Sequence, residues 1–262
     1  MATLSASYLN LLDWQAPPGV QAMITNRHGG VSQAPFDSLN LGLHVSDDPK
    51  CVDQNRQTLR TRLPAEPIWL NQVHGSTIFN ANTWNGIDVP EADGVVTNQV
   101  NRVLAIMTAD CLPVLLASRN GSVIGAAHAG WRGLAGGVIE RTVEAMRDLD
   151  RHNHSSHFIQ AYLGPAIGPQ AFEVGAEVRD LFLTHQSQDA KHFIQLDKKD
   201  KYLANLYGLA TSRLHSLGIQ LIEGGQECTY QNQNFFSYRR DQRTGRMGSF
   251  IWIQSNNSAH EV

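Results

Sequence analysis

Three residues that can bind a metal or act as nucleophiles occur in similar local settings. His74, Cys111 and His128 each follow an apolar segment and are flanked by small residues, in the stretches NQVHG, TADCLP and AAHAGWRG. Imidazole and thiolate groups are good ligands for Zn²⁺ and copper. The three residues are far apart in the sequence, unlike the local ligand pairs of a zinc finger, and no fourth ligand is evident. The pattern is typical of a catalytic metal site with one open position.

The same three residues also fit simpler interpretations. A cysteine between apolar strands is often a small hydrophobic core residue, and a histidine at a strand end is often only hydrogen-bonded within the core. A third interpretation is a Cys–His nucleophilic pair. Sequence spacing does not separate these alternatives.

Short strands and amphipathic helices must position these residues. Apolar runs bounded by polar residues or glycine predict strands at 20–26, 68–73, 103–107, 114–117, 123–127 and 159–163. Apolar residues recurring every three or four positions predict helices at 134–149, 175–183 and 203–217. The segment 235–254 is expected to form a hairpin with its turn at 242–245. Because strands and helices do not alternate regularly, a mixed-sheet α/β fold is favoured over a Rossmann or TIM fold.

Composition restricts the class of protein. The 262 residues are 42% hydrophobic and 17% charged, with a net charge of −3 and no basic stripe, so no nucleic-acid partner is expected. No apolar window approaches the roughly 18 residues that span a bilayer, and the first residues do not resemble a signal peptide, so no membrane association is expected. Three separated cysteines without a C-x-x-C pair indicate reduced thiols and a cytoplasmic location. No linker interrupts the chain, which predicts a single domain over residues 1–262.

Several long motifs resemble one known family. They are the three stretches around His74, Cys111 and His128, together with TNRHGGVS at 25–32, SLNLG at 38–42, LGPAIGPQAFEVG at 163–175, and CTY, FFSYRRD and TGRM between 228 and 247. These motifs resemble the YfiH family, also called PgeF or the polyphenol oxidase/laccase-domain family, and purine nucleoside phosphorylase in newer naming. The resemblance covers nearly the whole chain. It implies an α/β fold built as a four-layer αββα sandwich of mixed sheets, similar to some cysteine hydrolases of the CNF type.

The resemblance also implies an activity and a cofactor. It implies one Zn²⁺ (or Cu²⁺) ion per chain, bound by His74, Cys111 and His128. The implied reactions are phosphorolysis of adenosine, inosine and S-methyl-5′-thioadenosine, and deamination of adenosine to inosine. The expected partners are therefore purine nucleosides and phosphate, and the expected state is a monomer.

Further residues are candidates for catalysis and substrate binding. Zinc deaminases use an H-x-E glutamate as proton carrier, but Ala129 and Gly130 follow His128. Asp110, beside Cys111, is the candidate replacement, and its alternative role is that of a turn residue bonding to its own backbone. For phosphate, Arg27 ahead of two glycines is the first candidate, since arginine donates two parallel hydrogen bonds. The other candidates are Arg239, Arg240 and Arg132 for phosphate, and Asn40 and Gln72 for ribose or base.

Two other functions fit the same residues. The resemblance to PgeF also implies a role in editing peptidoglycan precursors, which would suit a Cys–His hydrolase with Cys111 as nucleophile and His128 as base. The second is a copper-dependent polyphenol oxidase. Multicopper oxidases need about ten imidazoles in several H-x-H pairs, whereas this chain has one H-x-H, at His152 and His154 with His157 nearby, in a polar stretch that predicts a solvated loop. A non-catalytic zinc protein would instead need a fourth ligand, for which Cys228 is the spare thiol.

Overall fold

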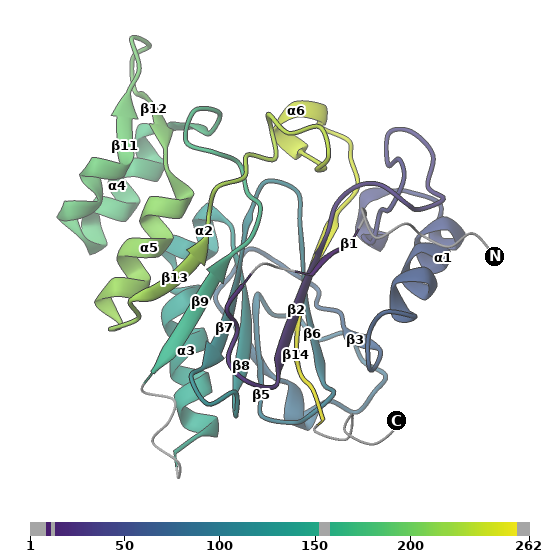
Figure 1. The fold of residues 1–262 in the computed structure, drawn as a ribbon. Helices are drawn as coiled ribbons and strands as arrows, with labels where there is room; N and C mark the ends of the chain where they lie inside the picture. The colour runs from purple at the N-terminus through teal and green to yellow at the C-terminus, as the bar shows by residue number, and fades with distance from the viewer. Residues whose placement is uncertain (1–8, 12–13, 152–157, 256–262) are drawn as a thin grey trace.

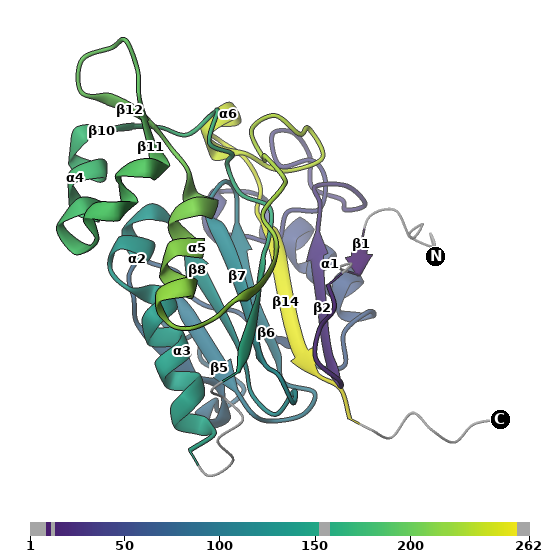
Figure 2. The ribbon, with the colours of Figure 1, turned by 60° about the vertical axis from the view of Figure 1, so that its left-hand side comes forward.

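The computed structural model describes residues 9–11, 14–151 and 158–255. Two mixed β-sheets pack face to face, and helices cover the outer face of each sheet (Figures 1 and 2). The order of layers is helix α1 (Pro49–Arg60), a five-stranded sheet, a six-stranded sheet, and a second helical layer. The α/β class and the αββα sandwich expected from the sequence are confirmed.

The five-stranded sheet is antiparallel except at one edge, where β3 runs parallel to β6. Its strands, in order across the sheet, are β1 (Leu9–Leu11), β2 (Val20–Thr25), β14 (Met247–Ile253), β6 (Val103–Thr108) and β3 (Pro67–Ile68). The six-stranded sheet is parallel at both edges and antiparallel between them. Its strands, in order, are β13 (Leu221–Gly224), β9 (Ile159–Leu163), β7 (Leu112–Ser118), β8 (Ile124–Ala129), β5 (Gly94–Thr97) and β4 (Ile78–Asn80).

The central strands are buried on both faces, which explains their continuous apolar sequences. In β6, Leu104 and Ile106 pack between the two sheets, while Val103 and Ala105 pack on the opposite face, in the core cluster that includes Leu59 of α1. Strand β7 divides its residues in the same way between the inter-sheet core and the second helical layer. Successive side chains of a strand point to opposite faces, so one strand contributes to two hydrophobic cores.

The second helical layer covers the six-stranded sheet. It contains α2 (Trp131–Ala135), α3 (Val138–Leu149) and α5 (Leu206–Ser216), with α4 (Ala176–His185) packed on α2. Beside α4 lies a small antiparallel sheet of β10 (Glu173–Gly175), β12 (Lys201–Ala204) and β11 (Phe193–Gln195). The remaining helical elements are the 3-10 turns η2 (Leu43–Val45), η3 (Ala81–Thr83) and η5 (Ser187–His192), and the short helix α6 (Tyr238–Asp241). Among the described residues, no helix has the length and apolarity to cross a membrane.

Most predicted elements are present, and three differ. The helix expected at 134–149 is two helices, because the chain breaks at Gly136 and at Gly137, whose φ is +84°. The strand expected at 68–73 pairs only through Pro67–Ile68. The prediction of a C-terminal hairpin is wrong, because only its second half is a strand, β14. Residues 238–241 instead form α6, which is capped by Ser237 Oγ, the acceptor of a hydrogen bond from the Arg240 N–H. Helix α1 was not predicted, and His152, His154 and His157 lie outside the described residues.

Candidate metal centre and its pocket

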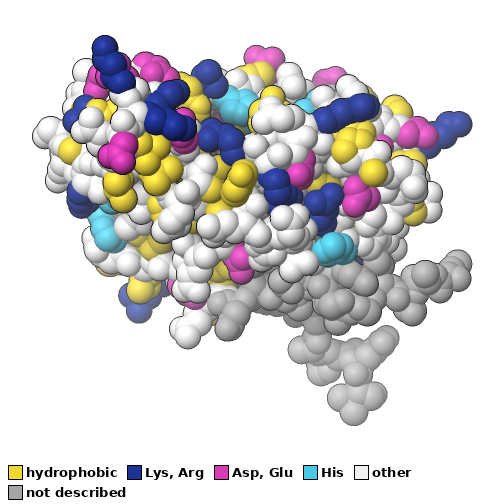
Figure 3. Space-filling model, turned by 90° about the horizontal axis from the view of Figure 1, so that it is seen from above, with side chains coloured by type: hydrophobic (Ala, Val, Ile, Leu, Met, Phe, Trp, Pro, Cys, Tyr) yellow, Lys and Arg dark blue, Asp and Glu magenta, His cyan; other side chains and the backbone are white. Residues whose placement is uncertain are grey.

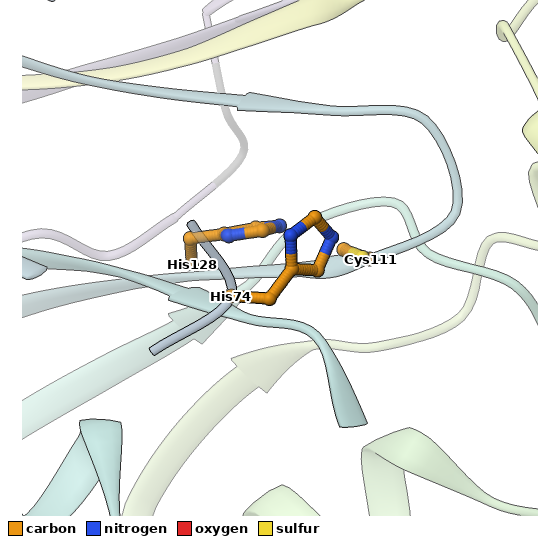
Figure 4. A group of neighbouring side chains, drawn as sticks. All are labelled: His74, Cys111 and His128. Carbon is orange, nitrogen blue, oxygen red and sulfur yellow. The ribbon is translucent and has the colours of Figure 1, made fainter. Parts of the chain in front are cut away.

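The structure brings His74, Cys111 and His128 together. Their potential ligand atoms all lie within 4.8 Å of one another, and the two imidazole rings are 4.8 Å apart between centroids at an angle of 73°. Figure 4 shows the three side chains converging on one point. Over residues 9–11, 14–151 and 158–255, this is the one group of three or more His, Cys, Asp or Glu side chains close enough to share an ion.

Each of the three residues comes from a different segment at the same end of the sheets. His128 is the next-to-last residue of β8, and its backbone pairs with Pro113 of β7. Cys111 lies in the turn from β6 to β7, after Asp110, whose φ is +91°. His74 lies in the connection from β3 to β4, with a φ of +62°. Because non-glycine residues rarely adopt positive φ, both connections need other contacts to hold them.

Asp93 supplies those contacts for His74. This fully buried carboxylate accepts hydrogen bonds from the backbone N–H groups of Val73 (3.2 Å), His74 (2.9 Å) and Gly75 (2.6 Å). Its Oδ1 also accepts from Nδ1 of His128 at 2.8 Å. One side chain therefore fixes both the loop that carries His74 and the ring orientation of His128, whose Nε2 is left for a metal.

A glycine allows the three residues to approach one another. A Cβ atom at Gly130 would lie 2.9 Å from Sγ of Cys111 and 3.2 Å from Cδ2 of His74. A Cβ at Gly133 would lie 2.7 Å from the carbonyl oxygen of Gly75. Both glycines belong to the AHAGWRG stretch, so close packing explains why small residues surround His128.

The charges in this cluster favour a thiolate. Desolvation raises the pKa of Cys111, but the charge and hydrogen bonds of His128 and His74 outweigh it and lower the pKa to about 6. Burial lowers the pKa of His128, but the Cys111 thiolate and the Asp93 carboxylate raise it to about 9. For Asp93, burial raises the pKa, and hydrogen bonds from His128, Gly75 and His74 lower it overall. A deprotonated cysteine and a histidine oriented by a carboxylate are the donor set expected for Zn²⁺ or copper.

A cavity of about 400 Å³ adjoins the three residues. Its walls combine apolar and aromatic side chains, among them Trp131, Phe172 and Tyr238, with the guanidinium groups of Arg132, Arg239 and Arg246. Figure 3 looks down on the end of the molecule that carries α6 and shows basic and histidine side chains among hydrophobic ones on this face. A mostly apolar cavity with a few cationic groups suits a ligand that has both an aromatic ring and an anion.

Besides the three central residues, four predicted residues line this cavity: Gln72, Asp110, Arg132 and Arg239. The Gln72 amide is bound at both ends to the backbone of Met107, at 2.8 Å each. Asp110 accepts from Thr229 Oγ1 and from the N–H of Arg239, both at 2.6 Å, so it anchors the start of α6. The Nη1 of Arg239 donates to the carbonyl of Glu173 at 3.0 Å.

Three predicted residues lie away from the cavity walls. Arg27 bonds to the carbonyl of Asp37 at 2.8 Å and lies over the ring of Phe236. Asn40 is fully buried among backbone groups. Arg240 donates to the carbonyls of residues 229, 230 and 235. The glycine pair after Arg27 is therefore not evidence for a phosphate site at that arginine.

Three residues of the site, Asp93, His44 and Arg246, were not predicted from the sequence. His44 and Arg246 line the cavity, and Asp93 supports two of the three central residues. Arg246 lies in the TGRM stretch quoted for the family resemblance, which was a usable signal. Asp93 precedes a buried strand in the sequence EADGVVT, and nothing in that local pattern separates it from an ordinary turn residue.

The fold and the pocket define a laccase-domain protein with a His–Cys–His centre, and residues 21–254 match the family described as multi-copper polyphenol oxidoreductase laccase. The chain belongs to the YfiH family of these proteins. It is 48% identical over 250 residues to the purine nucleoside phosphorylase YfiH of Escherichia coli (strain K12), covering 94% of this chain and 99% of that protein. It is 45% identical over 247 residues to the purine nucleoside phosphorylase of Haemophilus influenzae, covering 92% and 98%.

Solved structures agree with this assignment. The crystal structure of Neisseria meningitidis protein NMB0706 superposes with a TM-score of 0.87 at 44% identity, covering 95% of this chain and 100% of that one. YlmD from Geobacillus stearothermophilus superposes with a TM-score of 0.84 at 30% identity, covering 97% and 98%.

Proposed function

We propose that this protein is a metal-dependent purine nucleoside phosphorylase that acts on adenosine, inosine and S-methyl-5′-thioadenosine and also deaminates adenosine. The observation that carries the proposal is the shared cavity, in which the His–Cys–His centre, three arginines and three aromatic side chains lie together. The relatives named purine nucleoside phosphorylase support the same reaction.

Phosphorolysis needs an anion and a nucleoside side by side. An oxygen of phosphate forms a bond to C1′ of the ribose while the C1′–N9 bond breaks. The purine leaves with the bonding electrons and takes up a proton, and the other product is ribose 1-phosphate. The arginines of the cavity are suited to hold the phosphate, and Trp131, Phe172 and Tyr238 are suited to hold the purine ring. An ion bound by His74, Cys111 and His128 would supply Lewis acidity at this end of the cavity.

Deamination of adenosine replaces the amino group at C6 by a water oxygen and releases ammonia. It needs a group that carries a proton from the water to the leaving nitrogen. Asp110 remains the candidate for that role because it lines the cavity, although both its oxygens already accept hydrogen bonds. An Asp110→Asn variant is expected to lose inosine formation, whereas adenine release should fall less, through the loss of one hydrogen bond that anchors α6.

The test is an assay of the zinc-loaded protein with adenosine in the presence and absence of inorganic phosphate. Phosphate-dependent release of adenine and ribose 1-phosphate is expected, whereas inosine formation should not require phosphate. His74→Ala, with its metal content measured, serves as the metal-deficient control. A fully metal-loaded protein that releases no base from any of the three nucleosides would contradict the proposed phosphorylase.

A second candidate function is a thiol hydrolase acting on an amide, such as a peptidoglycan precursor. The observation in its favour is the row of Cys111, His128 and Asp93, in which a carboxylate orients an imidazole beside a low-pKa thiol. Amide cleavage that survives chelation and is abolished by iodoacetamide would support this function. A copper-dependent polyphenol oxidase is supported less, because the described residues place a single group of metal-binding side chains together.

A further inference from the structure

Arg246 is a partly buried cation without an acidic partner. Its guanidinium lines the cavity, and its Nη1 donates to the carbonyl oxygens of Thr244 at 3.0 Å and Gly245 at 2.9 Å. In the part of the chain that the structure describes, no carboxylate oxygen lies within 4.0 Å of it. Burial lowers its pKa even though Cys111 and Asp110 oppose that shift. A partly buried charge that makes no ion pair is costly unless a ligand neutralises it.

The surrounding backbone fixes Arg246 in this position. Oδ1 of the fully buried Asn40 accepts from the Arg246 N–H at 2.9 Å, and the Arg246 carbonyl accepts from the N–H of Leu41 at 3.2 Å. A Cβ at Gly42 would lie 2.8 Å from Cγ of Arg246. The SLNLG and TGRM segments, about two hundred residues apart in the sequence, therefore meet to hold one arginine.

Two further basic groups lie beside Arg246. His44 lines the same cavity, and its pKa is lowered by burial and by the charges of Arg246 and Arg56. Arg56 stacks on the ring of Trp69 at 3.9 Å and donates to the carbonyl of Leu41 at 2.7 Å through Nη2. Like Arg246, Arg56 makes no ion pair among the described side chains. Arg246 and Arg56 thus place two cations on this side of the molecule, and His44, whose lowered pKa favours the neutral ring, adds an N–H donor.

The other two arginines of the cavity belong to its aromatic wall. Arg239 lies over the ring of Phe172 at 5.4 Å, and Arg132 lies over the ring of Trp131 at 4.3 Å. Stacking of this kind suits the side of the cavity that receives a flat base. The basic corner formed by Arg246 and His44 lacks such a partner and is the better place for an anion.

We propose that Arg246 and His44 form the phosphate subsite of this cavity, and that Asn40 and Gly42 act as positioning residues for Arg246. The ligand class is a tetrahedral oxyanion, inorganic phosphate, and its identification as a substrate rests on the proposed function. In the described part of the chain only Nη1 of the Arg246 guanidinium donates to protein acceptors, so Nε and Nη2 remain available for two phosphate oxygens, and His44 in the cavity wall offers one more donor.

Direct binding of inorganic phosphate tests the subsite without turnover. Calorimetric titration of the metal-loaded protein with phosphate is expected to show binding that weakens at least tenfold in Arg246→Gln and less in Arg246→Lys. Gly42→Ala, which displaces the side chain and keeps its charge, is expected to weaken binding as well. Arg27→Gln, an arginine outside the cavity, is the matched control and should bind phosphate as the unchanged protein does. Metal content and melting temperature confirm that each variant is folded.

Steady-state kinetics separates this inference from the proposed function. Arg246→Gln should raise KM for phosphate at least tenfold and leave KM for the nucleoside nearly unchanged. If Arg246→Gln catalyses phosphorolysis with an unchanged KM for phosphate, the proposed phosphate subsite is wrong and the proposed phosphorylase activity is correct. If phosphate binding depends on Arg246 but the protein cleaves no nucleoside, the proposed subsite is correct and the proposed phosphorylase activity is wrong. Absence of phosphate binding by the unchanged protein would overturn the subsite.

Discussion

At the scale of single residues, the centre depends on a carboxylate that binds no metal itself. Asp93 connects two of the three central residues, through the His128 ring and through three backbone N–H groups around His74. Second-sphere carboxylates of this kind fix the tautomer and orientation of a ligating histidine and increase its basicity. Asp93 is therefore expected to contribute to metal affinity indirectly, by holding two of the three ligands in place.

Replacing Asp93 by asparagine tests this role. Asp93→Asn keeps the size of the side chain but weakens the hydrogen bonds to His128 and to the loop, so Zn²⁺ affinity should fall by roughly 10- to 100-fold. Competition with a chromogenic chelator measures the change. Asp88→Asn, at an exposed carboxylate, is the control and should leave the affinity unaltered. Equal affinities in Asp93→Asn and the unchanged protein would contradict the assigned role.

At the scale of elements, the Gln72 side chain makes hydrogen bonds that a longer strand β3 would otherwise make. Beyond β3 the backbone leaves β6, and the Gln72 amide makes the two hydrogen bonds to Met107 that a continuing strand would have made. This explains why the apolar segment 68–73 predicts a longer strand than the one observed. It also gives Gln72 a structural task in addition to its place in the cavity wall.

Gln72→Ala is expected to be mainly a stability variant. It leaves the N–H and carbonyl of Met107 without their partner, which costs about 1–3 kcal/mol of the free energy of unfolding. Denaturant unfolding measures this loss. The Gln57→Ala variant on the exposed side of α1 removes the same side chain at little cost and serves as comparison. Unchanged stability with a large rise in KM for the nucleoside would instead assign Gln72 to substrate binding.

The contact between η5 and α5 predicts a dependence of stability on pH. Nε2 of His192 lies 2.9 Å from Oγ of Ser212, and burial, followed by the charge of Lys191, lowers the pKa of His192. The unfolded chain therefore takes up a proton first, near pH 6.5, as the pH falls. The stabilising contribution is present above that pH and is lost as the pH falls through the lowered pKa. Between about pH 7.5 and 5.5, the unfolding free energy should fall more steeply in the unchanged protein than in His192→Gln; equal slopes would refute this.

The elements buried on both faces could be predicted from the sequence, and those held by distant contacts could not. Strands β6, β7 and β8 have mostly apolar residues because each contributes to two cores. Helix α6 depends on the carboxylate of Asp110, far away in the sequence, which accepts from the N–H of Arg239. The local pattern therefore predicted a hairpin. Helix α1 buries only Val52, Asn55 and Leu59, so its apolar period is weak even though Asp48 and Pro49 mark its start.

The residues of the candidate site also divide into those predicted from local motifs and those held in place by distant contacts. Residue types and motifs predicted His74, Cys111 and His128, which do converge. The glycine pair after Arg27 favours that residue as a phosphate ligand, but its guanidinium bonds to Asp37 outside the cavity. Arg246 is held at the cavity by a hydrogen bond from its N–H to Asn40, 206 positions away in the sequence, and the TGRM motif was the one local signal for it.

At the scale of the whole molecule, the centre lies where the chain passes between the two sheets. His74 is on the connection from β3 to β4 and Cys111 on the connection from β6 to β7, and both connections leave the five-stranded sheet for the six-stranded one. An ion bound there would link these two connections to β8, which carries His128. Metal binding is therefore expected to stabilise the packing of the sheets, and the single domain over 1–262 stays a prediction.

Removal of the metal should lower the melting temperature. At a free ion concentration 100 times Kd, binding to the folded state alone stabilises it by about 2.7 kcal/mol. At roughly 2–4 °C per kcal/mol for a chain of this size, chelation should lower the midpoint by about 5–10 °C. Thermal unfolding with and without chelator measures this shift, and His74→Ala should show little of it. An unaltered midpoint after complete metal removal would show that the two connections do not depend on the ion.

The hydrogen bonds from the loop to Asp93 have one more consequence. They come from the backbone, so the loop keeps its shape whatever side chain stands at position 74. Since φ there is +62°, glycine is the residue that fits best once the imidazole is removed. A His74→Gly protein should therefore contain a preformed hole of the size of the lost ring, open to solvent because His74 is exposed. Free imidazole diffusing into that hole should restore the missing nitrogen ligand, a chemical rescue that a collapsed loop would not permit.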